Sequence, residues 1–135
     1  PHVLRRSLPS ASFGVPGGQM ARKNMLVVCT TCRRACADPL TPSDGMRLSE
    51  ALAARGVPHD RQECFSACER SCVVVFRGPG RWTYVQGSLD PDLHSDDVAD
   101  MARAYAATPD GIVPWRSRPD VIRKHTIARI PPIEV

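Results

Sequence analysis

The sequence lacks the features that would place it at once among enzymes or membrane proteins. No apolar run reaches the length of a membrane-spanning helix, and residues 1–24 contain no stretch like the apolar part of a secretory signal peptide. We find no paired carboxylates, no nucleophile with a base and no phosphate-binding loop, so we do not expect an enzyme. These absences predict a cytoplasmic protein that binds no membrane, in which structural disulfides are rare.

Excess positive charge is confined to one end of the chain. Four of the 18 basic side chains and none of the 14 acidic ones lie in residues 1–24, so the rest of the chain balances at 14 of each. The net charge of +4 therefore says little about nucleic acid, and we expect no nucleic-acid partner. We interpret residues 1–24, rich in Pro, Gly and Ser, as a disordered arm or an expression remnant.

The predicted elements indicate one α/β domain over residues 25–107. In order, we expect a strand at 25–29, a helix at 45–56, a strand at 57–63, a hairpin with strands at 73–76 and 82–87, and a helix at 95–107. Thr41 or Ser43 caps the first helix, Gly56 ends it, and Ser95 is the N-cap of the second. Residues 108–135 are expected to form an extended tail that packs on the domain and is anchored by Trp115.

Six cysteines form two tight groups, which indicates metal binding because several thiolates must converge on one point. The first group is Cys29, Cys32 and Cys36, and the second is Cys64, Cys68 and Cys72. Cys29 ends the first predicted strand and Cys64 follows the second. A strand–helix–strand unit makes these strands parallel, so both groups should meet at the carboxyl edge of the sheet, where α/β proteins usually bind ligands.

Four thiolates from two loops can bind zinc, a [2Fe–2S] cluster or a [4Fe–4S] cluster. Zinc sites favour two similar C-x2-C pairs, whereas here a C-x2-C pair is followed by C-x3-C. A [2Fe–2S] cluster suits two separate pairs, and a [4Fe–4S] cluster built on the triplet CTTCRRAC stays open. The CTTC motif also fits a thiol–disulfide protein, although a Pro-bearing loop separates it from the predicted helix whose N-terminus would activate it.

The pattern VVCTTC…ECFSACERSCVVVFRGPGRWTYVQG resembles the thioredoxin-like [2Fe–2S] ferredoxins and the related small subunit of the respiratory complex I flavin module. In those proteins two cysteines follow the first strand, and a C-x3-C pair precedes an apolar strand and a hairpin. More closely, residues 25 to about 133, tail included, resemble a bacterial family of predicted metal-binding proteins. Some members are encoded near cobalamin-biosynthesis genes, which implies a role in cobalamin metabolism.

The resemblance implies a thioredoxin-like fold, one [2Fe–2S] cluster and one-electron transfer with a protein redox partner. It implies Cys29 as the first ligand and Cys64 and Cys68 as the third and fourth. We take Cys32 as the second ligand, because CTTC follows the predicted strand directly. Cys36 is the alternate, because ferredoxins of this type space their first pair more widely than C-x2-C. Cys72 has no counterpart among those ligands and is kept as a second alternate or a core thiol. A homodimer is also left open.

Two alternatives from other classes are retained: a zinc- or cobalt-handling protein, and a CxxC thiol–disulfide protein. Rieske-type ligation by His59 and His94 is not expected, because neither lies within a cysteine loop. Arginines beside the cysteines either offset the charge of a cluster or are ordinary solvated side chains; they are Arg33, Arg34 and Arg70.

Overall fold

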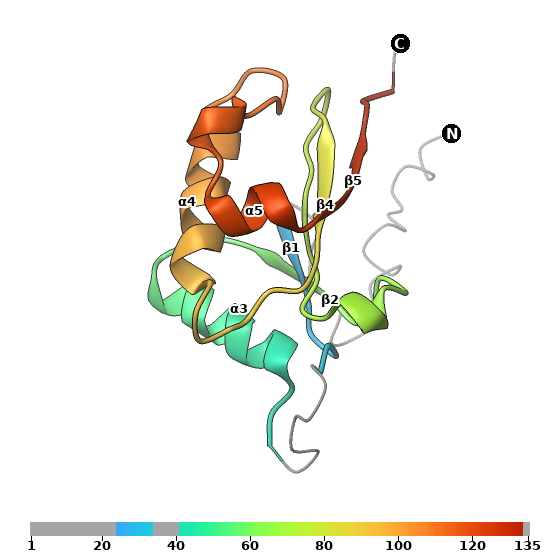
Figure 1. Cartoon of the computed structure of the whole chain (residues 1–135), viewed down its shortest axis with the longest axis vertical. Coiled ribbons are helices and arrows are strands. Elements are labelled where there is room, and N and C mark those ends of the chain that lie inside the picture. Colours follow the sequence, from blue (N-terminus) through green and yellow to red (C-terminus); the bar gives the residue numbers. More distant parts are fainter. Residues whose placement is uncertain (1–23, 34–40, 134–135) are drawn as a thin grey trace, which may run out of the picture.

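The computed structural model describes residues 24–33 and 41–133, which form one mixed sheet with helices on one of its faces (Figure 1). The strands are β1 (Leu26–Cys29), β2 (Asp60–Gln62), β3 (Val74–Phe76), β4 (Thr83–Gln86) and β5 (Thr126–Ile130). The helices are α3 (Asp44–Ala54), α4 (Ser95–Ala106) and α5 (Asp120–Lys124), with 3-10 turns η1 (Cys68–Arg70) and η2 (Trp115–Ser117). None of the described helices is both long enough and apolar enough to span a membrane.

The sheet has the strand order β2-β1-β3-β4-β5. Strand β1 is parallel to β2 and antiparallel to β3, and β3 continues into β4 as an antiparallel hairpin. A strand–helix–strand unit is thus followed by a hairpin and a helix. This confirms the expected α/β class and the thioredoxin-like order of elements.

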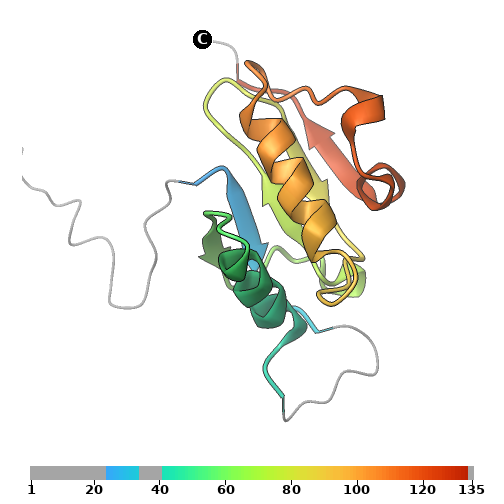
Figure 2. The same cartoon turned by 90° about the vertical axis from the view of Figure 1, so that its left-hand side faces the viewer.

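Helices α3 and α4 cover the same face of the sheet (Figure 2) and enclose the core. Leu48 and Leu52 of α3 and Met101 and Tyr105 of α4 are fully buried against the strands. The ring of Tyr105 lies 5.8 Å from that of Phe76, centroid to centroid. Burying each such side chain stabilises the fold by roughly 1.5–3 kcal/mol, so this face fixes the register of the strands that carry the cysteines.

The helix ends follow the sequence signals with one correction. Of the two expected caps of α3, Ser43 is the N-cap and accepts the N–H of Met46 at 3.1 Å. Gly56 has φ +73°, the left-handed conformation that ends a helix. For α4 the expected N-cap Ser95 is wrong: His94 is the cap, because the Ser95 hydroxyl instead donates to the carbonyl oxygen of Pro91 at 2.5 Å.

The segment after α4 packs on the domain and adds elements that the sequence pattern does not predict. Helix α5 follows it, and β5 then pairs with β4 as the fifth strand of the sheet. The expected anchor is wrong, because Trp115 is 61% exposed, whereas Val113 and Ile122 are fully buried. Trp115 instead stacks with Arg118 and Arg123, whose guanidinium carbons lie 5.5 and 5.8 Å from its ring.

Candidate metal centre

The two cysteine loops meet at one edge of the sheet, as the parallel strands require. Cys29 ends β1 and lies in register with Gln62, which ends β2. The N–H of Thr30 then donates to the carbonyl oxygen of Gln62 at 2.8 Å. This hydrogen bond holds together the two segments that follow β1 and β2. Beyond the strands, the hydroxyl of Thr31 donates to the carbonyl oxygen of Glu63, the residue before Cys64.

The first pair of thiols is buried, and each thiol shifts the pKa of the other. Cys29 is 2% exposed and Cys32 is 3% exposed. The Cys29 thiol donates to the carbonyl oxygen of Glu63, in the second loop, at 3.5 Å. Backbone N–H groups of Thr31 and Phe65 act to lower the pKa of Cys29, and that of Val73 acts to lower the pKa of Cys32. Phe65 and Val73 belong to the second cysteine loop and the start of β3. Each buried sulfur is therefore held by both halves of the site.

These contacts set opposite proton affinities on the two buried thiols. The hydrogen bond from Cys32 lowers the pKa of Cys29 to about 5; burial opposes this shift, and the N–H of Thr31 adds to it. The same hydrogen bond, followed by burial, raises the pKa of Cys32. Because metals bind the thiolate, the first loop stabilises Cys29 in its ligand form.

The second pair of thiols is exposed. The sulfurs of Cys64 and Cys68 lie 3.8 Å apart, and the N–H of Ser66 donates to the Cys64 sulfur at 3.2 Å. The hydrogen bond with Cys64, together with its charge, raises the pKa of Cys68, and the charge of Cys29 adds a smaller effect. The two loops are joined next to this pair, because the Cys29 sulfur and the Thr31 hydroxyl both bond to the carbonyl oxygen of Glu63, the residue before Cys64.

Residues at the N-terminus of α3 form hydrogen bonds with the backbone of the first cysteine loop. The N–H of Gly45 donates to the carbonyl oxygen of Cys32 at 3.0 Å, and the hydroxyl of Ser43 donates to the carbonyl oxygen of Thr30. The helix is thus close to CTTC in space, and its separation in sequence from CTTC is no argument against dithiol chemistry. The burial of Cys29 and Cys32 is an argument against it, because thiol exchange needs an accessible sulfur.

Cys72 and the two histidines have hydrogen-bond partners outside the four expected ligands. Cys36 falls outside the described residues. Cys72 is fully buried in the core, and its backbone N–H and C=O bond to those of Leu89, which suits a core thiol. His59 contacts the hydroxyl of Ser49 at 2.6 Å, and His94 accepts the N–H of Asp90, so each is bound within its own neighbourhood.

The arginines that the sequence places beside the cysteines have different surroundings. Arg33 and Arg70 are exposed, and the guanidinium of Arg70 donates to the hydroxyl of Ser88 at 3.1 Å. Arg34 lies outside the described residues. Two cationic side chains thus stand at the surface of the loops that hold the thiols.

The positions of the four expected thiol ligands can be compared with what a zinc ion and a [2Fe–2S] cluster each require. Within residues 24–33 and 41–133, no group of three or more Cys, His, Asp or Glu side chains is arranged to hold a single metal ion. The four expected ligands instead form two close pairs. A zinc ion needs all four ligand sulfurs at about 2.3 Å from the metal. A [2Fe–2S] cluster instead takes one pair of thiolates on each iron. Two pairs of thiols are therefore able to supply the four ligands of a two-iron cluster.

Sequence reasoning missed one side chain of the site, Ser71. It is 8% exposed, and its hydroxyl donates to the carbonyl oxygen of Cys68 at 2.6 Å. Its side chain also partly offsets the raised pKa of Cys32, in the other loop. Its position just before Cys72 carries no motif that would have indicated this role. Only the meeting of the two loops shows it.

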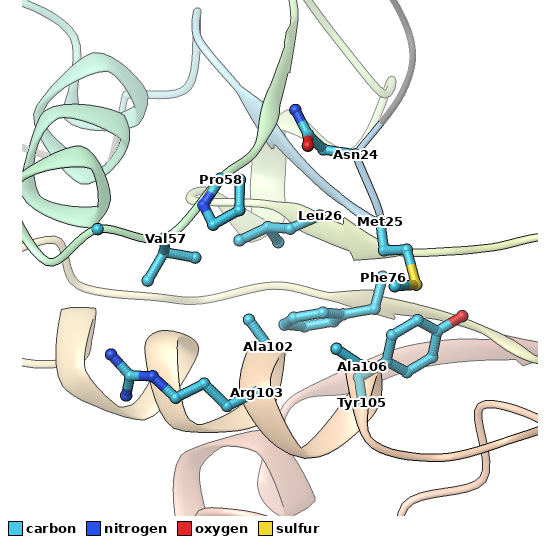
Figure 3. Close-up of a pocket in the computed structure, with 11 residues that line it drawn as sticks. Asn24, Met25, Leu26, Val57, Pro58, Phe76, Ala102, Arg103, Tyr105 and Ala106 are labelled. Atoms are coloured by element: carbon cyan, nitrogen blue, oxygen red, sulfur yellow. The ribbon is translucent and has the colours of Figure 1, made fainter.

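A separate cavity of about 250 Å³ lies at the opposite end of β1 (Figure 3). Its wall is mostly apolar and includes Leu26, Val57 and Phe76. Its polar groups are already engaged, since Asn24 bonds to Asp60 and the hydroxyl of Tyr105 donates to the backbone of Trp82. The cavity is therefore distinct from the cysteine site.

Comparison with known proteins gives one family and one solved structure. The family model described as "Protein of unknown function (DUF1636)" matches residues 26–132. The solved structure is that of a thioredoxin-like [2Fe–2S] ferredoxin from Aquifex aeolicus, 16% identical, with a TM-score of 0.48 over 82% of this chain and 96% of that chain. No curated protein matches the chain significantly.

Proposed function

This chain belongs to the DUF1636 family of proteins of unknown function, and we propose that it is a ferredoxin-like one-electron carrier that holds one [2Fe–2S] cluster. The ligands in this proposal are Cys29, Cys32, Cys64 and Cys68. One observation carries it: two close pairs of thiols from separate loops meet at the carboxyl edge of parallel strands.

The hydrogen-bond donors around the sulfurs support this proposal. When bound, a [2Fe–2S] cluster supplies one-electron redox chemistry, and with four thiolate ligands it is anionic. Backbone N–H groups of Thr31, Phe65, Val73 and Ser66 are directed at three of the four sulfurs. Such donors stabilise negative charge on sulfur, and this helps to set the reduction potential.

The unequal burial of the two pairs supports exchange of electrons with a protein partner. Cys29 and Cys32 are shielded from water, whereas Cys64 and Cys68 lie on the surface. A partner that docks on the loop 63–70 would reach the exposed pair without any rearrangement of the fold. Arg33 and Arg70 at this surface favour a partner with an acidic face.

The compartment and pathway form a further part of the proposal. The reducing cytoplasm suits a site of free thiols, and Cys29, Cys32, Cys64, Cys68 and Cys72 are all free of disulfides. A role in cobalamin metabolism rests only on the resemblance to a family with members encoded near such genes.

The first experiment is an ultraviolet–visible spectrum of anaerobically purified protein before and after dithionite, with iron and zinc quantified on the same sample. We expect visible bands that bleach on reduction and about two irons per chain. A colourless protein with about one zinc per chain would instead make this a structural or metal-handling domain.

The lowered pKa of Cys29, to about 5, favours a second candidate function, thiol–disulfide exchange by Cys29 and Cys32. The burial of both sulfurs weighs against it. Reduction of insulin disulfides by the metal-free protein in the presence of dithiothreitol tests this candidate, with Cys29→Ser as the control. Turnover that depends on Cys29 and needs no iron would favour exchange over electron transfer.

A further inference from the structure

The thiols of Cys64 and Cys68 lie close enough to bond to each other after a small movement. Their sulfurs are 3.8 Å apart. A disulfide bond is about 2.05 Å long, so the two sulfurs need to approach by less than about 2 Å. Rotation of one or both exposed side chains moves a sulfur over a distance of this order.

Hydrogen bonds on both sides of this pair hold the loop in place. The N–H of Ser66 donates to the Cys64 sulfur at 3.2 Å, and Ser66 itself has φ +61°. This left-handed residue turns the chain between the two cysteines. On the other side, the hydroxyl of Ser71 donates to the carbonyl oxygen of Cys68 at 2.6 Å. The fold therefore keeps the two thiols beside each other.

Accessibility separates this pair from the other described cysteines. Cys29, Cys32 and Cys72 are 3% exposed or less. Cys64 and Cys68 are both exposed. Thiol–disulfide exchange needs a sulfur that the oxidant can reach. A small disulfide in solution therefore meets Cys64 and Cys68 before the buried thiols.

We propose that Cys64 and Cys68 form a reversible disulfide when the chain holds no cluster, and that this bond prevents cluster assembly. The bond itself needs only the two thiols, whereas its effect on assembly rests on the proposed [2Fe–2S] function. In that function the pair binds one iron, so the disulfide removes two of the four ligands at once. Disulfides of the cytosol are usually transient and redox-sensing, and such a bond would report an oxidised thiol pool.

The oxidant in this step is a low-molecular-weight disulfide, RSSR. One cysteine thiolate attacks a sulfur of RSSR, a mixed disulfide forms, and the RS– that leaves takes up the proton that the cysteine lost. The second cysteine thiolate then attacks the protein sulfur of the mixed disulfide, and the second RS– leaves and takes up the second proton. The two cysteines lose two electrons and two protons in all, and RSSR becomes two RSH. An excess of small thiol reverses both steps.

The test treats the metal-free chain with oxidised glutathione and maps its cysteines by alkylation and peptide mass spectrometry. We expect a bond between Cys64 and Cys68, whereas Cys29 and Cys32 stay free. Dithiothreitol should restore both thiols. The iron-loaded chain, treated in the same way, should form no such bond, because iron holds both sulfurs. By linkage, a cluster that prevents the bond is itself disfavoured by the bond to the same extent.

Two variants make the test specific. In Cys68→Ser the sulfur of Cys64 has no partner, so we expect glutathione to remain attached to Cys64. Because Cys68 is exposed, circular dichroism should show an unaltered fold. Cys72→Ala is the matched control, since Cys72 follows Cys68 by one further step of the same spacing but is fully buried. It should form the bond between Cys64 and Cys68 as the unaltered chain does.

The outcomes separate this inference from the proposed function. A metal-free chain that gives only mixed disulfides, or that pairs Cys64 or Cys68 with another cysteine, would overturn the inference while the proposed function stands. The same bond in the iron-loaded chain, with its iron retained, would also overturn it. If the unaltered chain binds no iron, the proposed function and the effect on assembly are both wrong. A bond between Cys64 and Cys68 in that metal-free chain would still support the disulfide itself.

Discussion

Gly45 and Cys29 are in direct contact: a Cβ atom on Gly45 would lie 1.9 Å from the carbonyl oxygen of Cys29. Gly45 also donates its N–H to the carbonyl oxygen of Cys32 at 3.0 Å. The first turn of α3 can approach the cysteine loop this closely because Gly45 has no side chain. The positive end of the helix dipole is thereby placed beside the backbone carbonyl groups of Cys29 and Cys32.

We therefore expect Gly45→Ala to displace the first cysteine loop. The matched control is Gly56→Ala, because Gly56 has φ +73° and open space around its Cα. The control should cost about 1–2 kcal/mol of unfolding free energy, the strain of an L-residue in that conformation. Gly45→Ala should cost more and should also lower the iron content, measured by urea unfolding and metal analysis. Equal losses in the two variants would show that the contact has no special importance.

Replacing single cysteines should separate ligands from core thiols. Serine at Cys29, Cys32, Cys64 or Cys68 should abolish or strongly reduce visible absorption and bound iron, because each removes one of four thiolates. Cys72→Ala should keep the cluster at some cost in stability, since its side chain is fully buried. Cys36→Ala should also keep it. Loss of iron in Cys36→Ala with retention in Cys32→Ala would move the second ligand to Cys36.

The carboxylate of Asp60, at the start of β2, bonds to residues that lie next to the ends of β1 and β3. It is 2% exposed, pairs with Arg77 at 2.9 Å and accepts two hydrogen bonds from Asn24. We expect Asp60→Asn to lower the free energy of unfolding by about 2 kcal/mol, because it weakens several charge-assisted bonds at a buried position. Denaturant unfolding measures this effect.

The control for Asp60 is Asp100→Asn, whose ion pair with Arg103 is largely exposed on both sides. Its loss should cost less than about 1 kcal/mol and should depend on salt, because water and ions screen such a pair. If both variants lost the same small amount, Asp60 would contribute no more than an ordinary surface charge.

Tyr105 should make the fold sensitive to alkaline pH. Its hydroxyl donates to the carbonyl oxygen of Trp82 at 2.5 Å, and burial raises the pKa of Tyr105 to about 12. An unfolded tyrosine ionises near its ordinary pKa of about 10. The proton that the folded state retains therefore contributes stability that is fully present below pH 10 and is lost as the pH rises through 12.

Replacing this tyrosine by phenylalanine tests that dependence. Tyr105→Phe should be less stable at neutral pH by about 1 kcal/mol, since the carbonyl of Trp82 loses its donor. Its stability should then fall less steeply than that of the unaltered chain between pH about 10 and about 12. Urea unfolding at several pH values gives both quantities. A parallel fall in the two proteins would show that another group titrates in this range.

Much of the fold could be predicted because its elements carry local signals. The apolar run at 73–76 and the turn that follows it predict the β3–β4 hairpin, and Ser43 and Gly56 mark the ends of α3. Strand β5 has no comparable signal. It forms because β4 offers an open edge, and its residues become a strand only through hydrogen bonds to residues about 40 positions earlier.

The sequence by itself determined that two groups of cysteines follow two strands joined by a helix, and the parallel geometry of such strands brings both groups to one edge. Only the tertiary structure decided that Cys29 and Cys32 are buried whereas Cys64 and Cys68 are exposed. It also placed Gly45 and Ser71 against the cysteine loops. Burial and hydrogen bonds between distant segments depend on how whole elements pack, and no local pattern of residues encodes that packing.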